Sequence, residues 1–533
     1  YEGAYVAAPD APPFERWLAG RLDALVTRET TAYGTQRPVA FTNWVTTDPL
    51  EHPAEPVEYE DAVGVDPDAL VATDAFEAGL FAAYHAYPYY PDFLNHEPAY
   101  VDYEDRNGEP NSYAGYLHDL VAATDHPLLV AEFGVPDSRG IAHRHVHGRD
   151  QGHHTEREQG EIVAAMFEDI VAAGAAGGVA FAWHDEWFKR TWNLTHRSAP
   201  HRRPFWSNVQ TPEQSYGLLS FDPADAVRLA GHEDDWADAT TVEPGGPPTT
   251  LGDGDDAGRT LVGVDVTHDA AALAVRLRFA DLPDPVDWDA LNAVVALGVT
   301  GRGNTSLPRG LDLASFPTDF LVRLGGPDDS SVRVDPYADP FAARFGAEAG
   351  LDLATYRTPN TGRFVPIRMA ITRGYTVPST GDEVPFEAVE TGELRYGVGD
   401  PTAADYDSLA DVHVAPAANA VEMRLPWGLI NVADPSSGLR LADVWEGELG
   451  AFEPLDAITV AAATYAPDAD GVARPVDGAT NVTHAAPGVS NGRLRGATYA
   501  WERWDRPDYR ERRKESYDVL KETFTAHRSA ESE

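Results

Sequence analysis

Four apolar segments in the first two hundred residues constrain the fold more than any other feature of the chain. Each is a run of apolar residues that ends in polar and aromatic side chains, and together they occupy residues 38–44, 79–88, 127–134 and 177–187. Strands that are buried on both faces of a parallel sheet have this continuous apolar pattern. The sequence therefore predicts a parallel α/β fold for this part of the chain.

Helical periodicity precedes each apolar segment. We expect helices over residues 14–26, 66–77, 112–123 and 156–173, with Ser112 as the N-cap of the third. The result is four helix–strand units, half the number in an eight-stranded barrel. Residues 1–212 are therefore predicted to form a (β/α) barrel-type catalytic region, a partial TIM barrel.

The pattern changes after about residue 235. Apolar and polar residues alternate in short segments separated by connections rich in Gly, Pro and Asp: 273–279, 321–324, 331–334, 421–425 and 458–465. This pattern predicts an antiparallel β-sandwich over residues 213–495. Residues 496–533 are expected to form a tail that ends in a short C-terminal helix, with Tyr517, Leu520 and Phe524 on one side.

The composition narrows the classes of partner. The chain has 41 basic and 86 acidic residues, a net charge of −45, and no cysteine. The acidic side chains repel one another in dilute buffer, and concentrated salt screens this repulsion. The composition therefore indicates a high-salt organism. It disfavours nucleic acid and anionic membranes as partners, and no apolar run is long enough for a membrane span. The compartment stays open, with an extracellular or cell-surface location as the hypothesis.

Glu132 is the main catalytic candidate. It ends an otherwise apolar strand, and a buried carboxylate is costly unless it has partners or a chemical task. In a retaining glycosidase, one carboxylate attacks the anomeric carbon while another protonates the leaving oxygen. Tyr87, on the preceding strand, is well placed to donate a hydrogen bond to this nucleophile. The structural alternative is a glutamate that pairs with an arginine or caps a helix.

Other side chains near the strand ends are candidates for substrate binding. Aromatic rings can stack on a sugar, and amide, imidazole and carboxylate groups can hydrogen-bond to its hydroxyls. We expect this role for the following residues: Asn43, Trp44, His85, Tyr89, Trp183, Asp185 and Glu186. Structural roles are open for each of them, for example a core position for Trp183 or a turn position for Asn43.

A histidine-rich loop follows the third predicted strand. Histidine is the commonest metal ligand, but the helical spacing of a zinc site is absent. We therefore expect a polar loop over the substrate, and neither a metal nor a cofactor. The loop histidines are His143, His145, His147, His153 and His154.

The motifs around Glu132 resemble the last strands of clan A glycoside hydrolases, which are retaining (β/α)8 enzymes. The resemblance rests on His85-Ala86-Tyr87, the Glu132 strand and Trp183. It implies that Glu132 is the nucleophile, Tyr87 its hydrogen-bonding partner and Trp183 part of the sugar subsite. The family's acid/base glutamate follows an asparagine at the end of strand four, and no such pair occurs at that position here.

Two explanations of the missing acid are open. The chain can be the C-terminal portion of a retaining glycoside hydrolase that acts on a β-linked glycan, with an N-terminal portion of the same protein completing the barrel. It can instead be a non-catalytic carbohydrate-binding cell-surface protein with a degenerate barrel. An oligo- or polysaccharide is the expected ligand in both cases.

The second region resembles a family 9-type carbohydrate-binding module, which is related to the N-terminal sandwich of dopamine monooxygenase. The resemblance rests on residues 233–236 and 421–431. It implies a sandwich that holds a polysaccharide. Such modules can carry calcium in acidic loops, so calcium stays an alternative to the absence of a metal, although no calcium-loop pattern occurs in this sequence.

Overall fold

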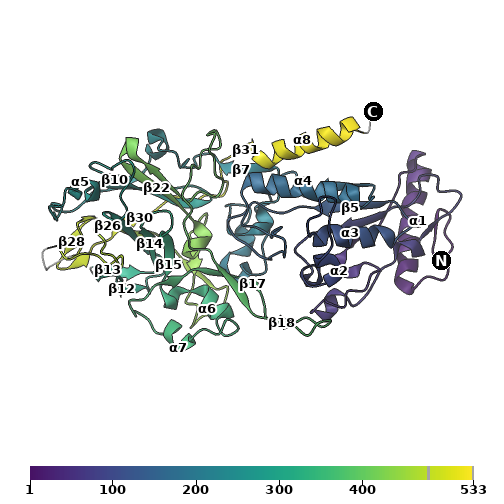
Figure 1. Ribbon diagram of the computed structural model, residues 1–533, viewed down its shortest axis with the longest axis horizontal. Helices are drawn as coiled ribbons and strands as arrows, with labels where there is room; N and C mark the ends of the chain where they lie inside the picture. Colours follow the sequence, from purple (N-terminus) through teal and green to yellow (C-terminus); the bar gives the residue numbers. More distant parts are fainter. Residues whose placement is uncertain (312, 477–480, 531–533) are drawn as a thin grey trace.

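A parallel sheet of four strands forms the centre of the N-terminal lobe in this computed structural model, which describes residues 1–311, 313–476 and 481–530 (Figure 1). The strand order is β2-β4-β5-β6, and every pairing is parallel, as the apolar runs predicted. The strands are β2 (Thr42–Trp44), β4 (Ala82–His85), β5 (Leu128–Phe133) and β6 (Gly177–Ala180). Because β2 and β6 are edge strands, this sheet is open, and the described residues do not close a TIM barrel.

Three long helices belong to this lobe, near three of the four predicted segments. They are α1 (Pro13–Tyr33), α3 (Ser112–Ala122) and α4 (Glu156–Ala172). The N-cap of α3 is Asn111 rather than Ser112, and its side chain accepts a hydrogen bond from the backbone of Ala114. A capping box of Thr155 and Glu158 begins α4.

The helix predicted over residues 66–77 is wrong. The Asp66 side chain accepts a hydrogen bond from the Asp68 amide and starts a single 3-10 turn, η3 (Pro67–Ala69). The next residues form β3 (Val71–Ala72), which pairs with β1 (Val6–Ala7). Backbone pairing to a strand more than sixty residues earlier therefore replaces the helix.

Two antiparallel sheets form the second lobe, and every predicted alternating segment forms a strand within them. The first sheet runs in the order β21 (Val412–Ala415), β22 (Ala420–Pro426), β10 (Ala272–Phe279), β9 (Leu261–His268) and β8 (Thr240–Val242). The second runs in the order β16 (Val365–Pro366), β15 (Ser331–Val334), β14 (Phe320–Leu324), β11 (Asn292–Gly298), β26 (Ile458–Tyr465) and β27 (His484–Ala486), with β30 (Ala497–Tyr499) also paired to β26.

Apolar side chains from both sheets form one core, but the outer face of the first sheet is also covered. Arg276 of β10 is buried and forms an ion pair of 2.8 Å with Asp265 of β9. The Trp236 ring covers this pair, with its centroid 4.9 Å from the Arg276 guanidinium carbon. Trp236 and Trp427 are both buried, so neither can stack on a saccharide in this state.

The tail of the chain returns to the first lobe. β31 (Tyr509–Arg513) pairs antiparallel with β7 (Leu219–Pro223), and α8 (Glu515–Ala530) then lies along α4 (Figure 1). The ring centroids of Phe524 and Phe167 are 4.7 Å apart. Gly160 allows the close approach, because a Cβ at this position would lie 2.7 Å from the Cα of Ser516. The predicted C-terminal helix is therefore present, and α4 covers its apolar side.

Shorter elements connect these parts. The helices are α2 (Pro98–Val101), α5 (Asp256–Arg259), α6 (Pro340–Phe345) and α7 (Leu353–Tyr356). The strands are β12 (Asn304–Ser306), β13 (Leu313–Thr318), β17 (Arg368–Thr372), β18 (Tyr375–Thr376), β19 (Glu383–Val384), β20 (Glu387–Glu390), β23 (Val432–Asp434), β24 (Leu439–Leu441), β25 (Phe452–Pro454), β28 (Val489–Ser490) and β29 (Arg493–Leu494). No helix in the described ranges is long and apolar enough to cross a membrane.

Candidate active site

The register of the parallel sheet brings three predicted site residues to one rim. Trp44 at the end of β2 is opposite His85 of β4, and His85 is opposite Glu132 of β5. Gly134 follows this strand end, where an added Cβ would lie 2.5 Å from the Phe181 carbonyl oxygen. The absence of a side chain at Gly134 therefore leaves space for the neighbouring segment.

The Glu132 carboxylate is held through one of its oxygens. The Tyr87 hydroxyl donates a 2.9 Å hydrogen bond to Oε2, and Nδ1 of His85 lies 3.1 Å from the same atom. Oε1 has no hydrogen-bond partner within the described part of the chain. The Glu132 side chain is 30 % exposed, so solvent and ligands can reach its carboxylate.

Tyr87 is a permanent donor in this arrangement. Burial, and then the neighbouring Tyr216 and Glu132, raise the pKa of the Tyr87 phenol far above its ordinary value. The phenol therefore keeps its proton at any pH at which the protein is folded. A permanent donor fixes the orientation of the carboxylate that accepts its hydrogen bond.

Aromatic side chains form most of the wall of the cavity above Glu132. The cavity has a volume of about 390 Å³. His143 lies in this wall, with ring centroids 5.1 Å from Tyr90 and 6.0 Å from Trp192. Burial lowers the pKa of His143 to about 4, so its imidazole is neutral near pH 7. The aromatic residues of the wall are Trp44, Tyr87, Tyr89, Tyr90, His143, Phe181, Trp192 and Tyr216.

Glu213 is a second carboxylate in this cavity, and no motif in the sequence predicted it as a site residue. It belongs to the 3-10 helix η7 (Pro212–Gln214), which follows the last strand of the sheet. Nε2 of Gln151 donates to Glu213 at 2.7 Å, and Nζ of Lys189 lies 3.7 Å away. Burial raises the pKa of Glu213, and Lys189 and Gln151 oppose the rise.

Four of the predicted substrate-binding residues lie outside the cavity. Asn43 is buried and hydrogen-bonds to the backbone of Val65 and Trp44. Trp183 is 59 % exposed, and its ring contacts Tyr517 of α8. Asp185 binds the ammonium group of Lys514, as described below. Glu186 forms an ion pair of 3.0 Å with Lys189. Trp44, His85, Tyr87, Tyr89 and Glu132 all line the cavity.

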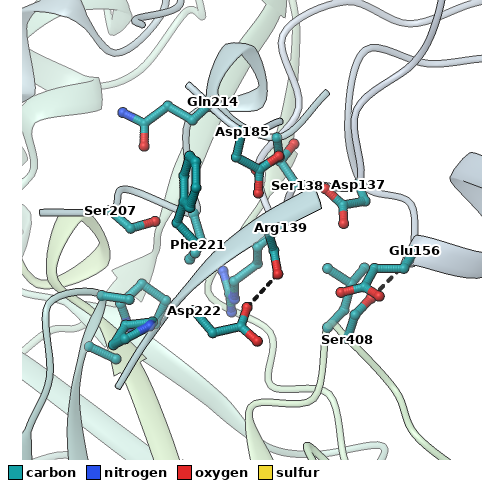
Figure 2. Close-up of a pocket in the computed structure, with 18 of the residues that line it drawn as sticks. Asp137, Ser138, Arg139, Glu156, Asp185, Ser207, Gln214, Phe221, Asp222 and Ser408 are labelled. Carbon is teal, nitrogen blue, oxygen red and sulfur yellow. Dashed lines mark hydrogen bonds between the residues drawn. The ribbon is translucent and has the colours of Figure 1, made fainter. Parts of the chain in front are cut away.

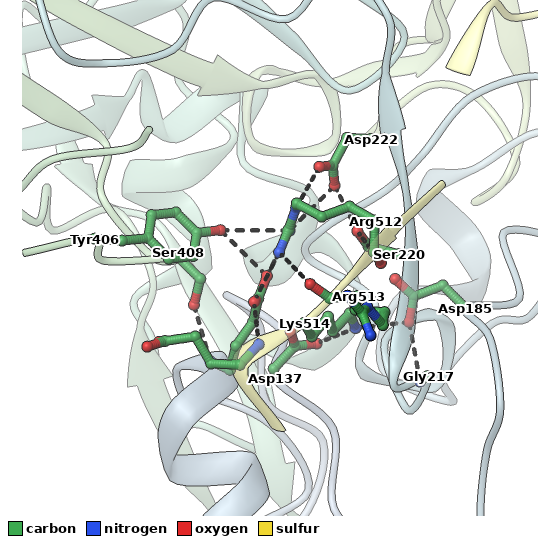
Figure 3. Close-up of polar contacts among 12 residues, drawn as sticks. Asp137, Asp185, Gly217, Ser220, Asp222, Tyr406, Ser408, Arg512, Arg513 and Lys514 are labelled. Carbon is green, nitrogen blue, oxygen red and sulfur yellow. Dashed lines mark hydrogen bonds and ion pairs between the residues drawn. The ribbon is translucent and has the colours of Figure 1, made fainter. Parts of the chain in front are cut away.

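A second, strongly polar cavity of about 180 Å³ separates the two lobes (Figure 2). Nζ of Lys514 lies 2.9 Å from the Asp137 carboxylate and 2.7 Å from that of Asp185 (Figure 3). Arg512 bridges Glu156 at 2.6 Å and Asp222 at 2.5 Å. Each of these charged groups has a partner of opposite sign, so the cluster connects segments that are far apart in the sequence.

The loop histidines are held by the protein itself. His145 is buried, with Nε2 2.9 Å from the Ser112 hydroxyl and Nδ1 accepting from the amides of His147 and Arg149. Burial lowers the pKa of His145 to about 3. In the ranges that the structure describes, no three His, Cys, Asp or Glu side chains are grouped to hold a metal ion.

No protein-family model matches the sequence, and no curated protein matches it.

Proposed function

We propose that Glu132 is the nucleophile of a retaining glycoside hydrolase that acts on a β-linked glycan. The observation that carries the proposal is the state of its carboxylate. One oxygen is fixed by Tyr87 and His85, and the other has no partner in an aromatic cavity. Aromatic walls suit the apolar faces of a sugar ring, and a held but reachable carboxylate suits attack on its anomeric carbon.

The reaction requires two steps. Oε1 of Glu132 forms a bond to the anomeric carbon while the glycosidic C–O bond breaks and the leaving oxygen takes a proton from an acid. Water then attacks the same carbon, gives its proton to the conjugate base of that acid, and releases Glu132. The Tyr87 hydroxyl, through its hydrogen bond to Oε2, orients Glu132 for the attack. Either Glu213 or a residue outside this chain supplies the proton.

The open sheet supports the proposal that this chain provides half of a barrel. Both edge strands carry exposed apolar side chains, with Trp44 of β2 43 % exposed and Val179 of β6 52 % exposed. Further parallel strands, from an N-terminal portion of the same protein, would cover both edges. The β-sandwich would then serve as an accessory module that holds the polysaccharide.

The second candidate function is carbohydrate binding without catalysis. The open sheet favours it, because no described strand pairs with the outer edge of β2 to complete a barrel. In this case Glu132 accepts hydrogen bonds from sugar hydroxyls and forms no bond to carbon. An extracellular or cell-surface location is part of both proposals.

Covalent trapping separates the two functions. We expect an activated 2-fluoro glycoside to label the full protein at Glu132, as located by mass spectrometry of its peptides. Glu132→Gln should abolish labelling and lower kcat/KM at least about a thousand-fold, because the nucleophile is lost. Glu161→Gln is the control, since Glu161 is exposed on α4 and lies outside the cavity. Labelling at another residue, or sugar binding without any labelling, would contradict the assignment.

A further inference from the structure

Two cations line the Glu132 cavity in a chain that is otherwise strongly acidic. They are Lys189 and Arg190, in the loop after β6. Lys189 already has two acid partners, Glu186 at 3.0 Å and Glu213 at 3.7 Å. Arg190 is exposed and makes no ion pair with any described residue. The guanidinium of Arg190 is therefore free to bind an anion that enters the cavity.

A second arginine without an acid partner lies near Arg190. Arg203 is only 7 % exposed, and its Nη2 donates to the Lys189 carbonyl at 2.6 Å. Its Nε and Nη1 are buried without a hydrogen-bond partner. Burial, together with the neighbouring charge of Arg190, lowers the pKa of Arg203 to about 10, so it is still a cation near pH 7.

Of the four other buried arginines in the described residues, three are neutralised, whereas Arg197, like Arg203, makes no ion pair. Arg259, Arg276 and Arg323 each form an ion pair with an aspartate. An unpaired buried charge is costly, and acids outnumber bases two to one in this sequence. Arg190 and Arg203 therefore keep N–H groups that no carboxylate of the described residues occupies, and those of Arg190 lie at one wall of the cavity.

We propose that the cavity binds an anionic saccharide, with Arg190 contacting its carboxylate or sulfate group. Guanidinium is the side-chain group best suited to this task, because its planar N–H pairs match two oxygens of either anion. Arg203 does not line the cavity, so it contributes positive charge from behind the loop of Lys189 and Arg190 without contacting the sugar. This inference rests on one part of the proposed function, namely that the cavity binds a saccharide.

The test compares probes that differ at one carbon. Calorimetry on the full protein carrying Glu132→Gln, which keeps the probe uncleaved, would use 4-nitrophenyl β-glucoside, β-glucuronide and β-glucoside 6-sulfate, and the corresponding galactosides. We expect at least one anionic probe to bind ten- to a hundred-fold tighter than its neutral counterpart, because charge-assisted hydrogen bonds have about this strength. A preferred glucuronide identifies a uronate, and a preferred sulfate identifies a sulfated sugar.

The variants decide whether Arg190 is responsible. Arg190→Gln should reduce the preference to about two-fold, and Arg190→Lys should retain part of it. Arg510→Gln, at an exposed arginine of β31, should leave the preference unchanged. Equal binding of neutral and anionic probes, no binding of any anionic probe, or a preference that survives Arg190→Gln would overturn the proposal.

The two proposals fail separately. Labelling of Glu132 without any anion preference overturns the substrate class alone. Anion binding that depends on Arg190, with no labelling of Glu132, overturns the nucleophile alone.

Discussion

At the scale of residues, two acids at neighbouring strand ends have opposite environments. Glu132 is partly exposed and receives a phenol and an imidazole on one oxygen. Asp185 is buried, and it binds the Lys514 ammonium and the Gly217 amide. The first environment leaves an oxygen free for reaction, whereas the second uses the carboxylate to connect segments of the fold.

The Tyr87 hydroxyl offers a test of how Glu132 is oriented. Tyr87→Phe removes the 2.9 Å hydrogen bond, which is charge-assisted and has a strength of about 1.5–3 kcal/mol. We expect kcat/KM for an aryl β-glycoside to fall roughly ten- to a hundred-fold, while the melting temperature changes little. Tyr84→Phe on the same strand is the control, because Tyr84 is buried away from the cavity. An unchanged rate in Tyr87→Phe would show that the phenol does not orient the nucleophile.

At the scale of elements, Lys514 fixes the segment from β31 to α8 to the first lobe, through Asp137 and Asp185. Burial raises the pKa of Asp137 to about 7 and that of Asp185 to about 6, and the ammonium opposes both shifts. Burial lowers the pKa of Lys514, but the two carboxylates outweigh it and the net shift is upward. Glu156 and Arg512 face the same cluster. The cation is therefore the group that allows both carboxylates to ionise.

Removing this cation should destabilise the protein in a pH-dependent way. In Lys514→Met both carboxyl pKa values rise further, so the carboxyls are protonated and tolerated at pH 5 but carry an uncompensated cost at pH 8. We expect a loss of about 3–5 kcal/mol in the free energy of unfolding at pH 8 and a smaller loss at pH 5. Chemical denaturation at the two pH values measures this difference.

Lys521→Met is the matched control for this experiment, since Lys521 is exposed on α8. It should change the unfolding free energy by less than about 0.5 kcal/mol at either pH. An equal loss at both pH values in Lys514→Met would mean that packing, and not charge, explains the effect.

The sequence predicted the elements that depend on local pattern. Continuous apolar runs predicted the parallel strands, and alternating apolar and polar residues predicted the sandwich strands. Both predictions are possible because burial of two faces, or of one face, determines which neighbouring residues are apolar. The strand register then places Glu132 beside His85, as expected for parallel strand ends. Glu213 and the partner of Asp185 could not be found this way. Their positions depend on contacts such as that between residues 185 and 514, which leave no local signal.

At the scale of the whole molecule, the net charge of −45 is the dominant electrostatic feature. Its self-repulsion opposes the compact state, and the Debye length falls from about 10 Å at 0.1 M salt to about 3 Å at 1 M. The Arg139–Asp411 ion pair, which links the two lobes, is almost fully buried and is therefore screened much less than the acids on the surface.

Salt should therefore stabilise this protein. We expect the midpoint of thermal unfolding, measured by circular dichroism, to rise continuously between 0.1 M and 3 M KCl. Sucrose at equal osmolality is the control, because it acts on hydration without screening charge. A midpoint that is flat or falls with KCl would contradict the role assigned to acid–acid repulsion.

The pairing of β7 with β31 has a consequence for biosynthesis. Residues 219–223 can form their strand pairing only after residues 509–513 have been synthesised. Translation of nearly three hundred residues therefore separates the synthesis of the two strands. Meanwhile the nascent chain exposes an unpaired strand and two aspartates that lack their lysine. This pairing therefore forms late in synthesis, and until it forms the unpaired edge is open to chaperones or to aggregation.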